Sequence, residues 1–242
     1  MVTHPLTVLF AAILAFIPVI IWLTILSKET NRERFRGLIT VFVIGTFSVV
    51  PILYIENIWV THPDLNLIGK ITDLVTEPYL VLLLTFLTFG VIEELVKARS
   101  VVFANTSLFP IKDIDTAIKF SLMVGLGFSF TENIFYFYTT LTSSINIFVI
   151  FMTILLRSTI STLGHMVFSG IFGYFYGIAQ FAKPFLEEEE WLGKHYRFAG
   201  LLNKLCGVEK AKIVEMEKKW TGLIIAALMH ALFNILLEKN LL

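Results

Sequence analysis

The hydrophobic pattern divides the chain into six long apolar runs separated by polar segments. Runs of about 20 apolar residues are long enough to span a bilayer as α-helices. The pattern predicts spanning helices at residues 6–26, 37–55, 78–104, 116–138, 145–181 and 220–237. The fifth would be ~54 Å long, against a hydrocarbon core of ~30 Å, so we expect it to tilt, break at a glycine or project beyond the membrane. The predicted fold class is an all-α polytopic membrane protein.

Two polar segments interrupt this pattern. Residues 56–77 form a predicted loop in which Leu67, Ile71 and Leu74 have helical spacing, so a short surface helix is expected there. Residues 182–219 form the one long polar segment and read as solvated helices that pack on the membrane surface. We therefore divide the chain into residues 1–77, with two spanning helices, and a four-helix core at 78–242 that carries the insert 182–219.

Composition agrees with a membrane protein and excludes other classes. Of the 242 residues 56% are hydrophobic and 16% are charged, against about 25% charged residues in a soluble domain. The net charge is zero, so no basic patch points to a nucleic-acid partner. A single cysteine, Cys206, excludes an internal disulfide and any multi-cysteine metal site. Residues 1–6 carry no Lys or Arg, so we expect no cleavable signal peptide.

The distribution of basic residues predicts the orientation. Alternating helices place segments 27–37, 97–119 and 181–219 on one side, and these hold 16 of the 19 Lys and Arg residues. Cytoplasmic loops are enriched in Lys and Arg. We therefore expect both termini to lie outside, and the protein to reside in a bacterial-type cytoplasmic membrane.

Charged side chains inside the apolar runs are the strongest functional signal. Glu93, Glu94 and Lys97 lie together in the third run. A charge at the bilayer centre costs at least ~2.5–3.5 kcal/mol, so such residues face other protein or a water-filled cavity. At helical spacing, Lys97 can pair with either carboxylate, which leaves the other one free to act. A buried structural ion pair is the alternative reading of this segment alone.

Polar residues in four of the predicted helices converge on one depth. From the helical rise and the predicted orientation, Glu93, Glu132, His165 and His230 all lie in the middle-to-inner part of the membrane. Such a set fits a divalent metal bound by His nitrogen and Glu oxygen with an open position for water. It also fits a glutamate that acts as general base beside a polarising histidine.

Other polar and small residues in these helices have simpler readings. We expect Arg157 to be a counter-ion for Glu132 or for backbone carbonyls, and Gly125 and Gly127 to be packing contacts. Ser169 is a poor nucleophile candidate, because no third group is evident that would orient His165 beside it. Small residues at four-residue intervals near His165 allow close helix contact in membranes; they are Ser161, Ser169, Gly173 and Gly177.

Read together, these residues resemble the PrsW family of intramembrane proteases, part of a larger superfamily with the CPBP (Abi) proteins and the type II CAAX prenyl endopeptidases. The likeness rests on four ordered motifs on separate helices, over residues 78–237. The motifs are EExxK at Glu93–Lys97, FxxxEN at Phe128–Asn133, an HxxxSG-like motif at His165–Gly170, and HxxxN at His230–Asn234.

The resemblance implies a role for each matched residue. Glu93 or Glu94 would activate the attacking water, and Lys97 would hold the other carboxylate. His230 and Asn234 would bind the scissile carbonyl oxygen or help to hold a metal. The prenyl endopeptidases have His where this chain has Glu132, so both a metal-dependent and a glutamate-dependent mechanism stay open. The expected catalytic set comprises Glu93, Glu94, Lys97, Glu132, Asn133, His165, His230 and Asn234; the expected ligands of a divalent metal, with zinc favoured, are Glu132, His165 and His230.

The leading functional hypothesis is therefore an intramembrane endopeptidase. Its substrate would be another membrane protein, a lipidated peptide or a peptide precursor, reached within or beside the lipid bilayer. An ion- or proton-coupled transporter would use the same carboxylates, but no clear inverted repeat is present. A non-catalytic scaffold, in which the polar set only joins the helices, is the third possibility. The sequence does not predict an oligomeric state.

Overall fold

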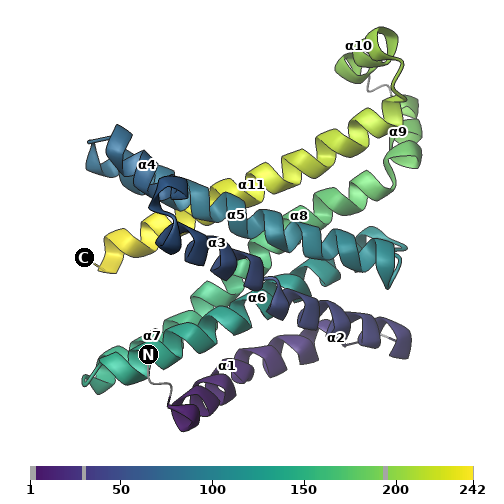
Figure 1. Cartoon of the computed structure of the whole chain (residues 1–242). Helices are drawn as coiled ribbons and strands as arrows, with labels where there is room; N and C mark the ends of the chain where they lie inside the picture. Colours follow the sequence, from purple (N-terminus) through teal and green to yellow (C-terminus); the bar gives the residue numbers. More distant parts are fainter. Residues whose placement is uncertain (1–3, 29–30, 193–195, 242) are drawn as a thin grey trace.

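The computed structural model describes residues 4–28, 31–192 and 196–241. Residues 1–3, 29–30, 193–195 and 242 lie outside this description, including three residues of the predicted insert 182–219. The described elements are all helical (Figure 1). They are α1 (Pro5–Leu26), α2 (Arg32–Phe47), α3 (Val50–Thr61), η1 (Pro63–Leu65), α4 (Leu67–Leu74), α5 (Pro78–Ser107), α6 (Ile114–Ser143), α7 (Ile147–Leu156), η2 (Arg157–Ser161), α8 (Thr162–Gln180), α9 (Ala182–Trp191), α10 (Arg197–Cys206) and α11 (Lys210–Leu241).

Within the described residues, six helical segments are long and apolar enough to cross a membrane, as predicted. They are Pro5–Leu26, Arg32–Thr61, Pro78–Ser107, Ile114–Ser143, Ile147–Gln180 and Lys210–Glu238. The loops predicted to share the cytosolic side do lie together, because Arg34 Nη2 is 2.7 Å from Asp113 Oδ2. The end of α5 likewise meets the end of α8, where Asn105 Nδ2 donates to Gln180 Oε1 at 3.0 Å.

The second predicted helix, 37–55, is divided into two. It breaks after α2, where the Ser48 hydroxyl donates to the carbonyl of Gly45 at 2.6 Å. Pro51 then lies in the first turn of α3, where a proline is tolerated because its missing N–H would have no partner inside the helix. Beyond α3, the predicted surface helix is present as α4; its N-cap is Asn66, whose side chain accepts from the Gly69 N–H.

The fifth predicted helix, 145–181, is one continuous helical segment, Ile147–Gln180, which does not break at a glycine but widens at a π turn. Residues 157–161 form η2, a single wide turn between α7 and α8. The carbonyl of Arg157 accepts a hydrogen bond from the Thr162 hydroxyl at 2.8 Å. The same carbonyl also accepts from the Thr162 backbone N–H, so the wide turn keeps its backbone hydrogen bond, as spanning helices require.

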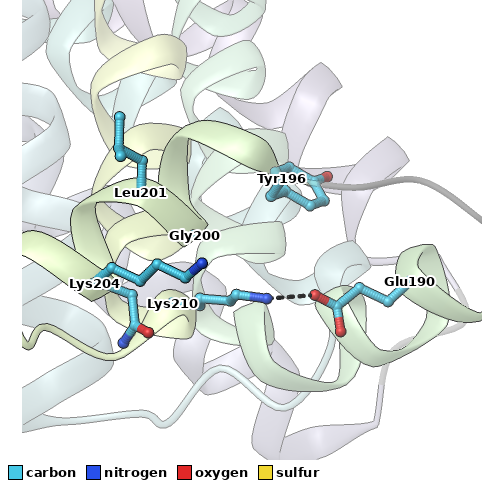
Figure 2. A pocket seen from close by; sticks show the side chains of 7 residues that line it. Glu190, Tyr196, Gly200, Leu201, Lys204 and Lys210 are labelled. Atoms are coloured by element: carbon cyan, nitrogen blue, oxygen red, sulfur yellow. Dashed lines mark hydrogen bonds and ion pairs between the residues drawn. The ribbon is translucent and has the colours of Figure 1, made fainter.

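The sixth helix begins ten residues before the predicted start at residue 220. α11 extends back to Lys210, and its buried Val214 packs against Ala182 and Leu186 of α9. The insert 182–219 therefore consists of α9, α10 and the first part of α11. An ion pair between Lys210 and Glu190, 3.0 Å apart, stands beside a surface hollow of about 420 Å³ (Figure 2). Lys210 and His230 are 20 residues apart on α11, or about 30 Å of helix, so this hollow lies far from His230.

Glycines set the closest helix contacts around α6. A Cβ on Gly127 would lie 2.2 Å from the carbonyl oxygen of Phe42 in α2. On the other side, a Cβ on Gly125 would lie 2.6 Å from the carbonyl oxygen of His165 in α8. Because these neighbours are backbone atoms, α6 can pack this closely between α2 and α8 only where it carries no side chain. The packing role expected for both glycines is present.

We predict that Gly127→Ala destabilises the protein, since its methyl group would overlap backbone that cannot rotate away. Overpacking of this kind costs about 1–3 kcal/mol, measured as thermal unfolding in detergent. Gly69→Ala is the matched control, because a Cβ there meets only ordinary contacts at 3.5 Å or more. Equal unfolding midpoints for the two variants would contradict the close packing of α2 on α6.

Candidate active site

The buried face of α5 carries the acidic motif. Glu93 and Glu94 are 9% and 1% exposed, whereas the neighbouring Val91 and Leu95 are 38% and 39% exposed. Helical geometry explains this division, because Lys97 lies one turn after the carboxylates on the same face. Gly90 brings α11 close, since a Cβ there would lie 3.0 Å from the carbonyl oxygen of Ala227. The motif thus points into the bundle.

Glu94 is fully engaged in a buried ion pair. Its Oε1 accepts from Lys97 Nζ at 2.7 Å and lies 2.9 Å from Nδ1 of His230. A carboxylate only accepts hydrogen bonds, so Nδ1 of His230 must carry the proton here and Nε2 keeps its lone pair. Glu94 therefore fixes the tautomer and orientation of His230 in the manner seen at metal and catalytic sites.

Glu93 is buried but not paired in this way. Its Oε2 lies 3.7 Å from Lys97 Nζ and 3.7 Å from His230 Nε2, too far for hydrogen bonds. This oxygen has no hydrogen-bond partner within the described part of the chain. Since buried polar atoms are usually satisfied, the atom calls for a water, an ion or a substrate group. Of the two carboxylates, Glu94 thus takes the hydrogen bond of Lys97, and Glu93 keeps only longer ion-pair contacts with Lys97 and His230.

His165 joins the second acidic motif to the first. Its Nε2 lies 2.8 Å from Glu132 Oε2, and its Nδ1 lies 2.9 Å from Lys97 Nζ. The ammonium can only donate, so Nδ1 accepts and Nε2–H donates to Glu132. Glu132 also pairs with Arg157, whose Nη2 is 2.8 Å away, so Arg157 is a counter-ion as expected. With both imidazoles neutral and all three carboxylates ionised, the two cations would leave one net negative charge.

Aromatic rings enclose these polar groups. Phe168 stacks on His230 with ring centroids 5.1 Å apart, and Phe128 lies 5.3 Å from His165. The Phe128 ring also covers Lys97, whose Nζ is 4.1 Å from its centroid. The first residue of the FxxxEN motif thus forms part of the wall of the site. A low-polarity wall of this kind strengthens the electrostatic interactions inside it.

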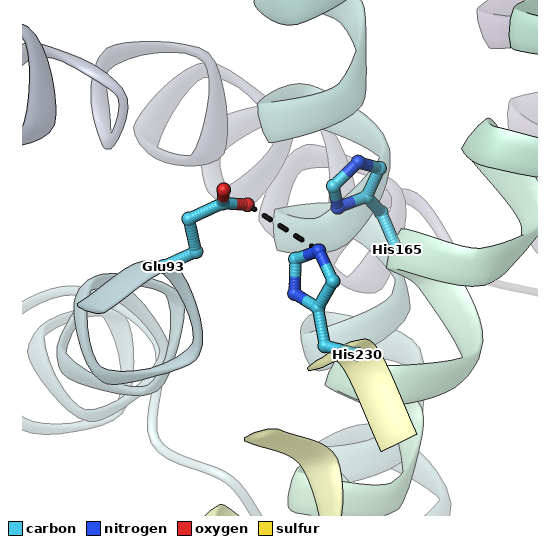
Figure 3. A group of neighbouring side chains, drawn as sticks. All are labelled: Glu93, His165 and His230. Atoms are coloured by element: carbon cyan, nitrogen blue, oxygen red, sulfur yellow. Dashed lines mark ion pairs between the residues drawn. The ribbon is translucent and has the colours of Figure 1, made fainter. Parts of the chain in front are cut away.

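Glu93, His165 and His230 form one group that could hold a metal ion. Each offers one ligand atom, and these atoms all lie within 4.8 Å of one another. Figure 3 shows the three side chains directed toward one another from α5, α8 and α11. Oε2 of Glu93 and Nε2 of His230 make no hydrogen bond and fit a divalent metal, whereas both ring nitrogens of His165 are already hydrogen-bonded, to Lys97 and to Glu132. Glu132, expected as the third ligand, lies outside this group and is held by His165 and Arg157.

The remaining expected residues lie near the cluster but differ in their contacts. Asn133 is fully buried and bonds to Arg157 and Thr162. Asn234 lies one turn after His230, is half-buried, and has no side-chain partner among the residues described. The Ser169 hydroxyl is buried without a hydrogen bond to any described residue, and it makes no contact with His165 that would activate it.

Sequence reasoning missed the hydroxyl groups of Ser129 and Thr162. The Ser129 hydroxyl donates to Thr162 Oγ1 at 2.9 Å, and Asn133 Nδ2 donates to the same oxygen at 3.1 Å. Hydroxyl residues are common in spanning helices, so neither stood out. Their significance comes from the π turn, which the apolar pattern does not reveal.

Comparison with known proteins agrees with the geometry. The sequence pattern of the PrsW family intramembrane metalloprotease matches residues 33–242. A relative named Protease PrsW, from Clostridioides difficile (strain 630), is 26% identical over 234 residues, which cover 94% of this chain and 88% of that protein. No solved structure matches the chain. With most of its length matched, and with the acidic and histidine motifs gathered between its helices, this chain belongs to the PrsW family of intramembrane metalloproteases and is a membrane-embedded hydrolase of peptide bonds.

Proposed function

We propose that Glu93, His165 and His230 form the centre that activates water for peptide-bond hydrolysis. The observation that carries this proposal is the buried Oε2 of Glu93, which lacks a described hydrogen-bond partner and stands 3.7 Å from Nε2 of His230. That separation is too long for a direct hydrogen bond but short enough for both atoms to share one water. In this arrangement Glu93 takes the proton of the water as it attacks the scissile carbonyl.

The neighbouring residues support this step without changing during it. Glu94 and Lys97 hold His230 and His165 in fixed tautomers, as the hydrogen bonds of 2.7–2.9 Å indicate. Asn234, half-buried one turn from His230, is the proposed donor to the carbonyl oxygen as negative charge develops there. The carboxylate of Glu132 holds the His165 ring from the other side.

The same three groups would hold the divalent metal that the family description implies, and we propose zinc. Two imidazoles and one carboxylate are a common ligand set for catalytic zinc, with a fourth position left for water. Zinc lowers the pKa of a bound water and polarises a carbonyl group. Glu93 would then serve as a ligand. We favour this set over the one expected from sequence, because Oε2 of Glu132 accepts bonds from Arg157 and His165. His165 would bind the metal through Nδ1, in place of its hydrogen bond from Lys97.

The proposed setting is a bacterial cytoplasmic membrane, since the relative comes from a bacterium. We assign residues 78–242 to the catalytic core, because α5, α8 and α11 contribute the three residues of the proposed centre and α6 contributes Glu132, which holds His165. Substrates are proposed to be membrane proteins or lipidated or membrane-bound peptides. The four ordered motifs support wider kinship with the CPBP proteins and the CAAX prenyl endopeptidases.

We predict that Glu93→Gln abolishes turnover, because an amide can neither take the proton of water nor bind a metal as a carboxylate does. Turnover of a fluorogenic membrane peptide should fall by about 100-fold or more. The control is Glu217→Gln, an exposed residue of the cytosolic part of α11, which should retain wild-type turnover. Retained turnover in Glu93→Gln would refute the proposed centre.

The zinc content of the purified Glu93→Gln variant then separates the two roles of this carboxylate. Loss of zinc together with turnover identifies Glu93 as a ligand. Loss of turnover with zinc retained identifies Glu93 as the proton acceptor. Element analysis by mass spectrometry measures the zinc content of the purified wild type and of the purified variant.

The proposed orientation makes a prediction for the single cysteine. Cys206 is exposed at the end of α10, in the insert assigned to the cytosol. A membrane-impermeant maleimide should therefore label it in inverted vesicles and not in intact cells. A Thr61→Cys variant in a Cys206→Ser background should show the reverse pattern. Thr61 is exposed at the C-terminal end of α3, which the proposed orientation places outside the cell. Labelling of Cys206 in intact cells would place the insert outside the cell and would contradict the proposed orientation.

A further inference from the structure

Arg157 occupies a position that a simple counter-ion does not require. It is the first residue of the π turn η2, and its side chain is only 17% exposed. Its guanidinium makes two different hydrogen bonds: Nη2 donates to Glu132 Oε2 at 2.8 Å, and Nε donates to Asn133 Oδ1 at 3.0 Å. The planar fork thus spans two successive residues of α6, which a flexible point charge cannot do.

The backbone of Arg157 is held by the same asparagine. Asn133 Nδ2 donates to Thr162 Oγ1 at 3.1 Å, and the Thr162 hydroxyl donates to the carbonyl of Arg157 at 2.8 Å. Ser129 donates to Thr162 Oγ1 as well, so that oxygen accepts two hydrogen bonds and gives one. The Thr162 hydroxyl thus uses its one donor hydrogen and both of its acceptor lone pairs. Asn133 therefore fixes both the π turn and the direction in which Arg157 leaves it.

An aromatic ring closes the remaining side. The Cζ of Arg157 lies 3.7 Å from the ring centroid of Tyr136, one turn after Glu132 on α6. A guanidinium over an aromatic face is a favourable cation–π contact. Glu132, Asn133 and Tyr136 thus hold the guanidinium from one helix, and the group has little freedom to move.

Arg157 is connected to the proposed centre through Glu132 and His165. Glu132 Oε2, to which Arg157 donates, also accepts from Nε2 of His165 at 2.8 Å. His165 belongs to the group with Glu93 and His230. We propose that Arg157 is a positioning residue: by fixing the Glu132 carboxylate, it sets the orientation of the His165 ring. This inference rests on the proposed function, because it assigns His165 to the water-activating centre.

The test compares Arg157→Lys with Arg99→Lys in the full-length protein. Arg157→Lys keeps the charge but loses the fork, so kcat for a fluorogenic membrane peptide should fall about 10–100-fold, the usual effect of losing an outer contact. KM should stay within about twofold, because the substrate is not contacted. Zinc affinity, measured by chelator competition, should weaken by a similar factor. Arg99 is exposed on α5 with no ion pair to a described residue, so its variant should match wild type.

A second matched pair keeps the test valid where Arg157→Lys fails to fold. Tyr136→Leu removes the ring that covers the guanidinium, whereas Tyr136→Phe keeps it. We expect kcat to fall about 2- to 5-fold in the first and to be unchanged in the second. In an Arg157→Ala variant, added methylguanidinium should restore turnover and methylammonium should not.

Specific outcomes would overturn the assignment. Wild-type kcat and zinc affinity in folded Arg157→Lys would show that charge alone suffices and that Arg157 is only a counter-ion. A raised KM with unchanged kcat would make it a substrate contact instead. Where Arg157→Lys does not fold, equal kcat values for the two Tyr136 variants would refute the inference. Absence of turnover in wild type would contradict the proposed function, and the zinc affinities of wild type and Arg157→Lys would then decide whether Arg157 positions His165.

Discussion

The need to pair charge inside the membrane governs this structure. Lys97 and Glu94 are each 1% exposed, and each would be very costly to bury alone. Their 2.7 Å contact is stabilised further by hydrogen bonds to two imidazoles, which come from α8 and α11. Because no lipid can replace these partners, the helices must meet around the pair. The same bonds that satisfy the charges also set the proton positions of His165 and His230.

The helix packing explains how such a cluster fits in so little space. Gly90 admits the backbone of α11, and Gly125 admits that of α8. Helix contact without side chains lets polar groups on neighbouring helices reach one another at hydrogen-bond distance, as is common in membrane proteins. The result is a network from Arg157 through Glu132, His165 and Lys97 to Glu94 and His230. Beside this network, Oε2 of Glu93 lies 3.7 Å from Lys97 Nζ and from His230 Nε2 without a hydrogen bond to either.

The spanning helices of this structure can be predicted from the local sequence, but the contacts between side chains of different helices cannot. Apolar run length predicts all six spans, because the bilayer sets the length of a helix. Spacing along α5 predicts that Lys97 pairs with a carboxylate. It cannot tell which one, because that choice depends on where His230 of α11 lies. Contacts between helices also decide that Glu93, and not Glu132, groups with His165 and His230. The π turn at Arg157 depends on such contacts as well. The early start of α11 depends on α9 in the same way.

The proposed centre requires that Glu93, His165 and His230 face one point between the helices. X-ray absorption at the zinc edge of the purified, zinc-loaded protein tests this most directly, because it reports the atoms that surround the metal. We expect nitrogen and oxygen neighbours only, with scattering from two imidazole rings, reduced to one ring in a His230→Ala variant. A spectrum without imidazole scattering, or one that His230→Ala leaves unchanged, would contradict the account.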